Sequence, residues 1–79
     1  MTIQLFSLLA DRLGDSVTIS VPDAVTAGEL KAQLAADYPG LAELIEQSTL
    51  AVNQAYVPDE ALVPGMAQEV ALIPPVSGG

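Results

Sequence analysis

The segment from Val17 to Leu34, VTISVPDAVTAGELKAQL, says most about the fold because it joins a strand pattern to a helix pattern. Its first five residues alternate apolar with polar side chains, which is typical of a strand with one buried face. Pro22-Asp23 ends this strand, and Thr26-Ala27-Gly28-Glu29 follows as a capping box, in which the first and last residues bond each other's backbone amides. A helix from Thr26 to Tyr38 is therefore predicted, with one apolar face, and Pro39-Gly40 ends it.

Further strand patterns lie on both sides of this segment. Ile3 and Leu5 predict a first strand, and residues 7–13 have a looser, helix-like spacing before Gly14-Asp15. The link to Val17 is short, so we expect the first two strands to pair antiparallel. Beyond the helix we expect a short helical turn over 41–46 and three more strands, which are marked by Leu50 and Val52, by Tyr56 and Val57, and by Val70, Leu72 and Ile73. The turn signals between them are Asn53-Gln54, Pro58-Asp59-Glu60 and Pro64-Gly65.

This order of elements favours an α+β fold. A mixed sheet of four to five strands would carry one main helix across one face, and the ubiquitin-like β-grasp is one of several folds with that arrangement. The residues expected to face the helix are Ile3, Leu5, Val17, Ile19, Leu50, Val52, Val70 and Leu72. We expect one domain over residues 1–75, followed by a flexible Gly-Gly tail over 76–79.

The composition argues against several classes of function. Ten acidic residues face only Arg12 and Lys31, and the formal net charge of −8 would repel nucleic acid and anionic membranes. The acidic surface either keeps a small protein in solution or steers it to a basic partner. The sequence has no Cys and no His, which removes thiolate nucleophiles, Ser–His relays and nearly every zinc site, so we expect no metal site.

The same sequence predicts the compartment. No apolar run approaches the roughly 18 residues that span a bilayer. The residues after Met1 lack the basic region of a signal peptide, so a cytoplasmic location is expected.

The segment Ile73-Pro74-Pro75-Val76-Ser77-Gly78-Gly79 suggests where the chemistry lies. The two prolines stop the sheet and hold the chain extended, whereas the glycines have no side chain to exclude them from a narrow channel. A carboxylate becomes a good electrophile once it is adenylated, and at Gly79 it would be unhindered. The alternative is a frayed terminus or a cloning scar, since both are often rich in Gly and Ser.

Residues 69–79, EVALIPPVSGG, resemble the carboxyl end of the small subunit of molybdopterin synthase, a family of ubiquitin-like sulfur carriers. Leu5-Phe6 followed by Gly14 is similar to that family's first strand and helical turn, and residues 26–34 to its capped helix. Ala51-Val52-Asn53-Gln54 resembles its Val-Asn-Gln turn. The sequence departs from the family at Leu8 and Ala10, where Arg or Lys is usual, and at 67–69, where Gly-Asp-Glu is usual.

The resemblance implies a carrier that holds sulfur on its backbone. An adenylating enzyme of the ubiquitin-activating type would use ATP to activate Gly79, and a sulfur donor would convert it to a thiocarboxylate, with Gly78 as the slim residue behind it. The large subunit of molybdopterin synthase would receive this tail and pass the sulfur to cyclic pyranopterin monophosphate, forming the dithiolene of molybdopterin. The chain would be the non-catalytic, sulfur-donating subunit of a sulfurtransferase and would bind no cofactor itself.

The resemblance also implies a partner surface. It assigns Phe6, Tyr56 and Ile73, together with the tail residues Pro74, Pro75 and Val76, to binding the large subunit in a heterotetramer with two copies of each chain. The alternation agrees, because it places Phe6 and Ile73 on the sheet face away from the helix, where exposed apolar groups often mark an interface. The alternative is that Phe6 and Tyr56 cover a small core.

Three other functions remain open at the level of sequence. A thiamin-pathway sulfur carrier shares the fold and the terminal glycines. A ubiquitin-like protein modifier shares the activation step but would form an isopeptide bond with a partner lysine. A non-catalytic β-grasp interaction module would not use the tail at all.

Overall fold

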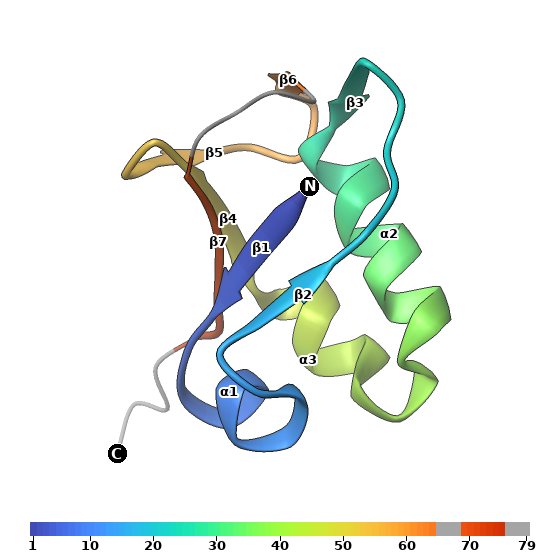
Figure 1. The fold of residues 1–79 in the computed structure, drawn as a ribbon, viewed down its shortest axis with the longest axis vertical. Coiled ribbons are helices and arrows are strands. Elements are labelled where there is room, and N and C mark those ends of the chain that lie inside the picture. Colours follow the sequence, from blue (N-terminus) through green and yellow to red (C-terminus); the bar gives the residue numbers. More distant parts are fainter. Residues whose placement is uncertain (65–68, 76–79) are drawn as a thin grey trace.

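The computed structural model describes residues 1–64 and 69–75, and these form a mixed sheet with helices on one side (Figure 1). The strands of the main sheet run, in spatial order, β2 (Ser16–Thr18), β1 (Thr2–Leu5), β7 (Val70–Ile73), β4 (Thr49–Val52) and β5 (Ala55–Val57). β1 and β7 are parallel, and the other three pairs are antiparallel. This is the α+β arrangement with five strands that the sequence predicts, and the fold class is confirmed.

The first two strands form the expected antiparallel pair around α1 (Ser7–Leu13). Gly14 ends this helix with a φ of 92°, a backbone conformation that residues with a Cβ rarely adopt. β2 ends at Thr18, earlier than the alternation predicts. The amide of Ile19 still donates to the carbonyl of Met1 at 2.9 Å, so the pairing continues beyond the assigned strand.

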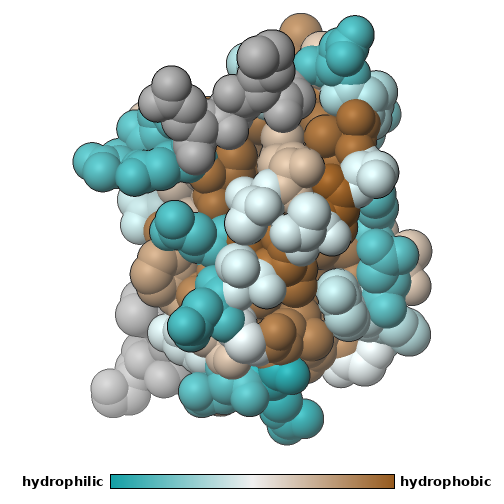
Figure 2. Space-filling view, in the orientation of Figure 1, coloured by the Kyte–Doolittle hydropathy of each residue, from teal (hydrophilic) through white to brown (hydrophobic). Residues whose placement is uncertain are grey.

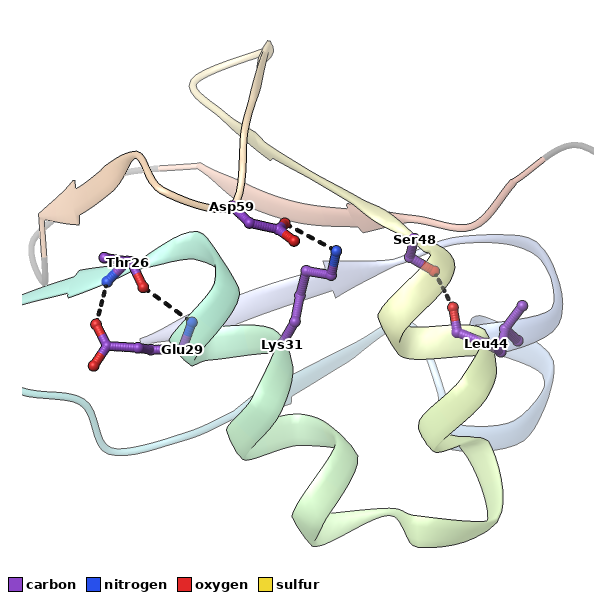
Figure 3. A network of polar contacts seen from close by, with 6 residues as sticks. All are labelled: Thr26, Glu29, Lys31, Leu44, Ser48 and Asp59. Carbon is purple, nitrogen blue, oxygen red and sulfur yellow. Dashed lines mark hydrogen bonds and ion pairs between the residues drawn. The ribbon is translucent and has the colours of Figure 1, made fainter.

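The main helix, α2 (Ala27–Asp37), begins at the predicted capping box (Figure 3). The Thr26 hydroxyl accepts from the Glu29 amide at 3.1 Å, and the Glu29 carboxylate accepts from the Thr26 amide at 2.9 Å. The bond from the Thr26 amide, followed by a smaller contribution from the Thr26 side chain, holds the pKa of Glu29 below its usual value, because donation to the carboxylate favours its charged form. Pro39 follows the helix and opens the short η1 (Pro39–Leu41), and the predicted turn over 41–46 becomes α3 (Ala42–Gln47).

The core lies between the main sheet and the layer of α2 and α3 (Figure 1). Leu34 is 1% exposed, as expected for the inner face of α2. Of the eight strand residues predicted to face this helix, Val52 is only half-buried, and the other seven are buried. In the view of Figure 2, hydrophobic residues occupy much of the middle, with several of intermediate hydropathy in front of them, and most hydrophilic residues lie toward the rims.

A second, two-stranded sheet was not expected from the sequence. β3 (Ala24–Thr26) pairs antiparallel with β6 (Leu62–Pro64) and places Val25 opposite Val63, both of them buried. The interpretation of Pro64-Gly65 as a turn is therefore wrong for Pro64, which is the last residue of β6. Proline fits there because it stands at the end of a short strand.

Two predictions, the flexible tail and the second half of the Pro64-Gly65 turn, concern residues that the structure does not describe. The flexible tail over 76–79 lies outside the described residues, and so do Gly65 and residues 66–68. None of the helices in the described part of the chain is both long and apolar enough to cross a membrane.

Candidate functional site

A hollow of about 380 Å³ lies on the face of the main sheet that points away from α2. It draws on four neighbouring strands and on the residues next to them. Its lining consists of Gln4, Phe6, Ala51, Gln54, Tyr56, Glu69, Ala71 and Ile73. We call this surface the outer face.

Strand alternation and register bring these side chains together. In β1 and β7 the residues pointing to the core are Ile3, Leu5, Val70 and Leu72, so the residues between them point outward. Ala71 lies opposite both Gln4 on β1 and Ala51 on β4, and Ala51 lies opposite Tyr56 on β5. Small alanines thus occupy the middle of the outer face while larger side chains surround them, which explains the hollow.

The rim of the outer face exposes large apolar groups. Phe6 is 45% exposed and Tyr56 is 69% exposed, whereas Ile73 is half-buried. The carbonyl of Phe6 accepts from the amides of Leu9 and Ala10, so the first turn of α1 fixes the backbone that carries the ring. Exposed apolar side chains around a shallow hollow are typical of a surface that a partner covers.

The polar end of the outer face depends on the β4–β5 turn. Asn53 and Gln54 have φ values of 50° and 70°, as a two-residue hairpin turn requires. The Asn53 amide donates to the carbonyl of Glu69 at 2.7 Å, and the Asn53 side chain accepts from the Glu69 amide at 3.1 Å. Asn53 therefore joins the turn to the residue before β7 and sets Gln54 and Glu69 at one end of the hollow.

The chain leaves the sheet next to this surface. β1 and β7 are parallel, with Leu5 opposite Leu72, so Phe6 and Ile73 follow at the same end of the sheet. Pro74 is buried and Pro75 is exposed. Val76, Gly78 and Gly79, which the sequence analysis assigns to the site, lie outside the described residues.

Part of this surface is predicted from the sequence. The structure brings Phe6, Tyr56 and Ile73 together, but their role in binding a partner stays a prediction. The other five lining residues were not predicted from the sequence. Alternation along β1, β4 and β7 could have identified Gln4, Ala51 and Ala71, whereas Gln54 and Glu69 depend on the Asn53 contacts, which no sequence period encodes.

Among the described residues, the outer face presents mainly apolar and amide groups. Over residues 1–64 and 69–75, no group of three or more His, Cys, Asp or Glu side chains could hold a metal ion. Of the described residues that line the hollow, Glu69 alone has a carboxylate, and the others contribute amide and apolar groups. Such a lining can hold another protein in register but supplies no pair of groups for acid–base catalysis.

Comparison with known proteins gives concordant results. The ThiS family model matches residues 3–79. The molybdopterin synthase sulfur carrier subunit of Homo sapiens is 44% identical over 66 residues, which cover 81% of this chain and 75% of the relative. The subunit of the same name from Dictyostelium discoideum is 40% identical over 80 residues, which cover 98% of this chain and 93% of the relative.

Two solved structures share the fold. SAMP1 from Haloferax volcanii superposes with a TM-score of 0.75 at 25% identity, covering 99% of this chain and 97% of that one. A complex of subunits 1 and 2 of molybdopterin-converting factor from Helicobacter pylori 26695 contains a chain with a TM-score of 0.64 at 22% identity. The superposition covers 99% of this chain and 96% of that chain. The second likeness concerns the fold alone.

Proposed function

Since this chain belongs to the ThiS family, we propose that it is the sulfur carrier subunit of a molybdopterin synthase. The observation that carries the proposal is the identity of 35–44% to curated proteins with that name. The Dictyostelium discoideum relative aligns over 98% of this chain, so the likeness is not confined to one motif.

In this proposal Gly79 carries the sulfur, and Gly78 lets the tail enter a narrow site. Both glycines fall within the match to the family, which runs to residue 79. An adenylating enzyme of the ubiquitin-activating type joins the Gly79 carboxylate to AMP, with pyrophosphate leaving from ATP. A sulfur donor then displaces AMP and leaves a thiocarboxylate. In this proposal the activation takes place in the cytoplasm, and the chain itself binds no cofactor.

The outer face docks the carrier on the large synthase subunit. Phe6, Tyr56 and Ile73 supply apolar contacts, and Pro74, Pro75 and Val76 continue from that face toward the glycines. Two copies of each chain form the assembly. The large subunit holds cyclic pyranopterin monophosphate and receives the sulfur that builds the dithiolene. Rigid β1 and β7 support both the contact surface and the start of the tail, so docking also aims the reactive group.

One experiment tests the carrier chemistry. The chain is incubated with the adenylating enzyme, ATP and a sulfur donor, and its intact mass is measured before the large subunit and cyclic pyranopterin monophosphate are added. We expect one oxygen to be replaced by one sulfur at Gly79, followed by loss of that sulfur as molybdopterin forms.

The other outcomes identify the alternatives. Transfer of the acyl group to a lysine of another protein would indicate a protein modifier. Delivery of the sulfur only to a thiamin-pathway acceptor would indicate that pathway. An unchanged mass, with function retained after deletion of Gly79, would indicate an interaction module.

A further inference from the structure

The single lysine of the sequence is buried, which is unusual for this residue type. Lys31 lies on α2, and its side chain is only 9% exposed. Its Nζ atom donates to the Asp59 carboxylate at 3.0 Å, on the loop that follows β5 (Figure 3). The Asp59 side chain is 67% exposed and lies over the amine.

Backbone contacts hold Asp59 in that place. The amide of Gly28, one helical turn before Lys31, donates to the Asp59 carbonyl at 2.8 Å. The approach is close, because a Cβ at Gly28 would lie 3.2 Å from the same oxygen. The Ala27 amide also donates to the carbonyl of Ala61 at 2.9 Å, so the start of α2 holds both ends of this loop.

Folding stability gives little reason for this arrangement. An ion pair with one well-exposed partner contributes little, and ordering a lysine side chain costs conformational entropy. An alanine or leucine at position 31 would suit the helix at least as well. What the arrangement does achieve is to leave little of this side chain open to solution, with its amine paired to a carboxylate.

We propose that Asp59 and its loop sequester Lys31 from acylation, so that the activated carboxylate of one copy is not captured by an amine of another copy. The sequestration stands on the contacts above, while its benefit rests on the proposed function. In the side reaction, the Nζ lone pair attacks the carbonyl carbon of the Gly79 acyl adenylate. An N–C bond forms, the C–O bond to AMP breaks, AMP leaves with the electron pair, and the amine proton passes to solvent. With no cysteine in the sequence, Lys31 is the one strong side-chain nucleophile that could compete with the sulfur donor.

A competition experiment within one molecule tests the sequestration without using the tail. Ala36 is exposed on the same helix, so Ala36→Lys adds a freely accessible lysine as an internal reference. The variant is treated with limiting acetyl N-hydroxysuccinimide ester, and peptide mapping follows acetylation at each lysine and, separately, at the α-amino group. If Lys31 reacts only after local opening, we expect it to be acetylated about tenfold or more slowly than the introduced lysine.

Variants of Asp59 test whether this residue is what slows acetylation of Lys31. Asp59→Ala, in the Ala36→Lys background, is expected to raise the rate at Lys31 toward that of the reference lysine. Equal rates at the two lysines while Asp59 is intact would overturn the proposal, and this comparison needs no destabilised variant. A thermal melt confirms that Asp59→Ala is folded, and an unchanged Lys31 rate in the folded variant would overturn the role of Asp59.

A second reaction tests the consequence for the carrier. Wild type, Asp59→Ala and Asp59→Ala/Lys31→Arg are incubated with the adenylating enzyme and ATP but no sulfur donor, and pyrophosphate release reports activation. We expect a covalent adduct of two chains, less one water, only in Asp59→Ala. The same Lys31-linked adduct in wild type, or none in activated Asp59→Ala, would contradict protection from self-acylation. No pyrophosphate from any variant would instead contradict the proposed function, while the acetylation rates still decide the sequestration.

Discussion

Phe6 joins two structural roles at one position. Its carbonyl begins α1 by accepting from the Leu9 and Ala10 amides, while its ring is 45% exposed beside Ile73 on the outer face. Ser7, which follows it, has a φ of 52°, so the backbone turns sharply as soon as the ring has been placed. A backbone held by these bonds loses little further freedom when a partner covers the ring, which favours tight contact.

The first prediction concerns the contact residues of the outer face. Phe6→Asp and Ile73→Asp, made singly, should each weaken binding to the large synthase subunit by about 2–4 kcal/mol, because each would bury an unpaired charge. Isothermal titration calorimetry measures this. Leu62→Asp is the matched control, since Leu62 is 69% exposed on β6, away from the outer face. Wild-type affinity in both outer-face variants would show that the interface lies elsewhere.

A second prediction follows from the pKa of Glu29, which is lowered in the folded state. Its stabilising effect is therefore fully present above the unfolded-state pKa of glutamate, about 4.3, and is lost as the pH falls through the lower folded-state pKa. Chemical denaturation of wild type and Glu29→Gln should show wild type as the more stable at neutral pH. The difference in their free energies of unfolding should shrink as the pH falls below about 4.3. A difference independent of pH would show that the charge on Glu29 has no part in the cap.

Among the elements, the sequence predicted α1, α2 and the strands of the main sheet, and it missed β3 and β6. α2 was found from its capping box and Pro39, and α1 from the spacing of its leucines, because each has several residues in register with a helical period. β3 ends at Thr26 and β6 ends at Pro64, so the capping box and the turn signal led the sequence to assign these residues to other elements. Their pairing is set by long-range contacts, with Val25 opposite Val63, and such contacts leave no local signal.

The capping box gives a third prediction, on the helix as a unit. Thr26→Ala should lower the free energy of unfolding by about 0.5–2 kcal/mol, because the amide of Glu29 loses its acceptor at the first turn of α2. Thr26→Ser keeps the hydroxyl and should retain most of the stability. Urea denaturation compares the three proteins, and equal midpoints for wild type and Thr26→Ala would contradict the capping role.

The packing of α2 on the sheet gives a fourth prediction. Leu34→Ala should lower the free energy of unfolding by about 2–5 kcal/mol, because it leaves a cavity among buried side chains. Such a loss is a large share of the stability of a small domain. Ala36→Leu, at an exposed site on the same helix, serves as the control for helix propensity and should stay close to wild type. A small effect of Leu34→Ala would mean that the core collapses to fill the space.

For the whole molecule, the topology places the outer face next to the point where the chain leaves β7. β7 is parallel to β1 in the middle of the sheet, so the residues that follow β7 begin beside Phe6. The sequence predicted this neighbourhood because first and last strands adjoin in the expected fold. It did not predict the burial of Lys31, since a lysine on a helix is normally solvated and only the position of the loop at Asp59 shows otherwise. The parts of the site that depend on strand order were thus predictable, and those that depend on loop placement were not.

The last prediction treats the tail as a part of fixed length. Deleting Gly79 removes one extended residue, about 3.5 Å of reach, and adding one residue after Gly79 moves the reactive carbonyl outward by the same amount. A misplacement of even 1 Å can lower a rate by about a hundredfold, so neither variant should support molybdopterin formation at a useful rate. Both should keep the wild-type melting temperature and the wild-type affinity for the large subunit, because the core and the outer face are untouched. Assays of thiocarboxylate formation and of sulfur transfer, run separately, show whether activation or delivery is lost. If either variant forms molybdopterin at the wild-type rate, sulfur is not carried at a fixed position on Gly79, and the carrier mechanism is wrong for this chain.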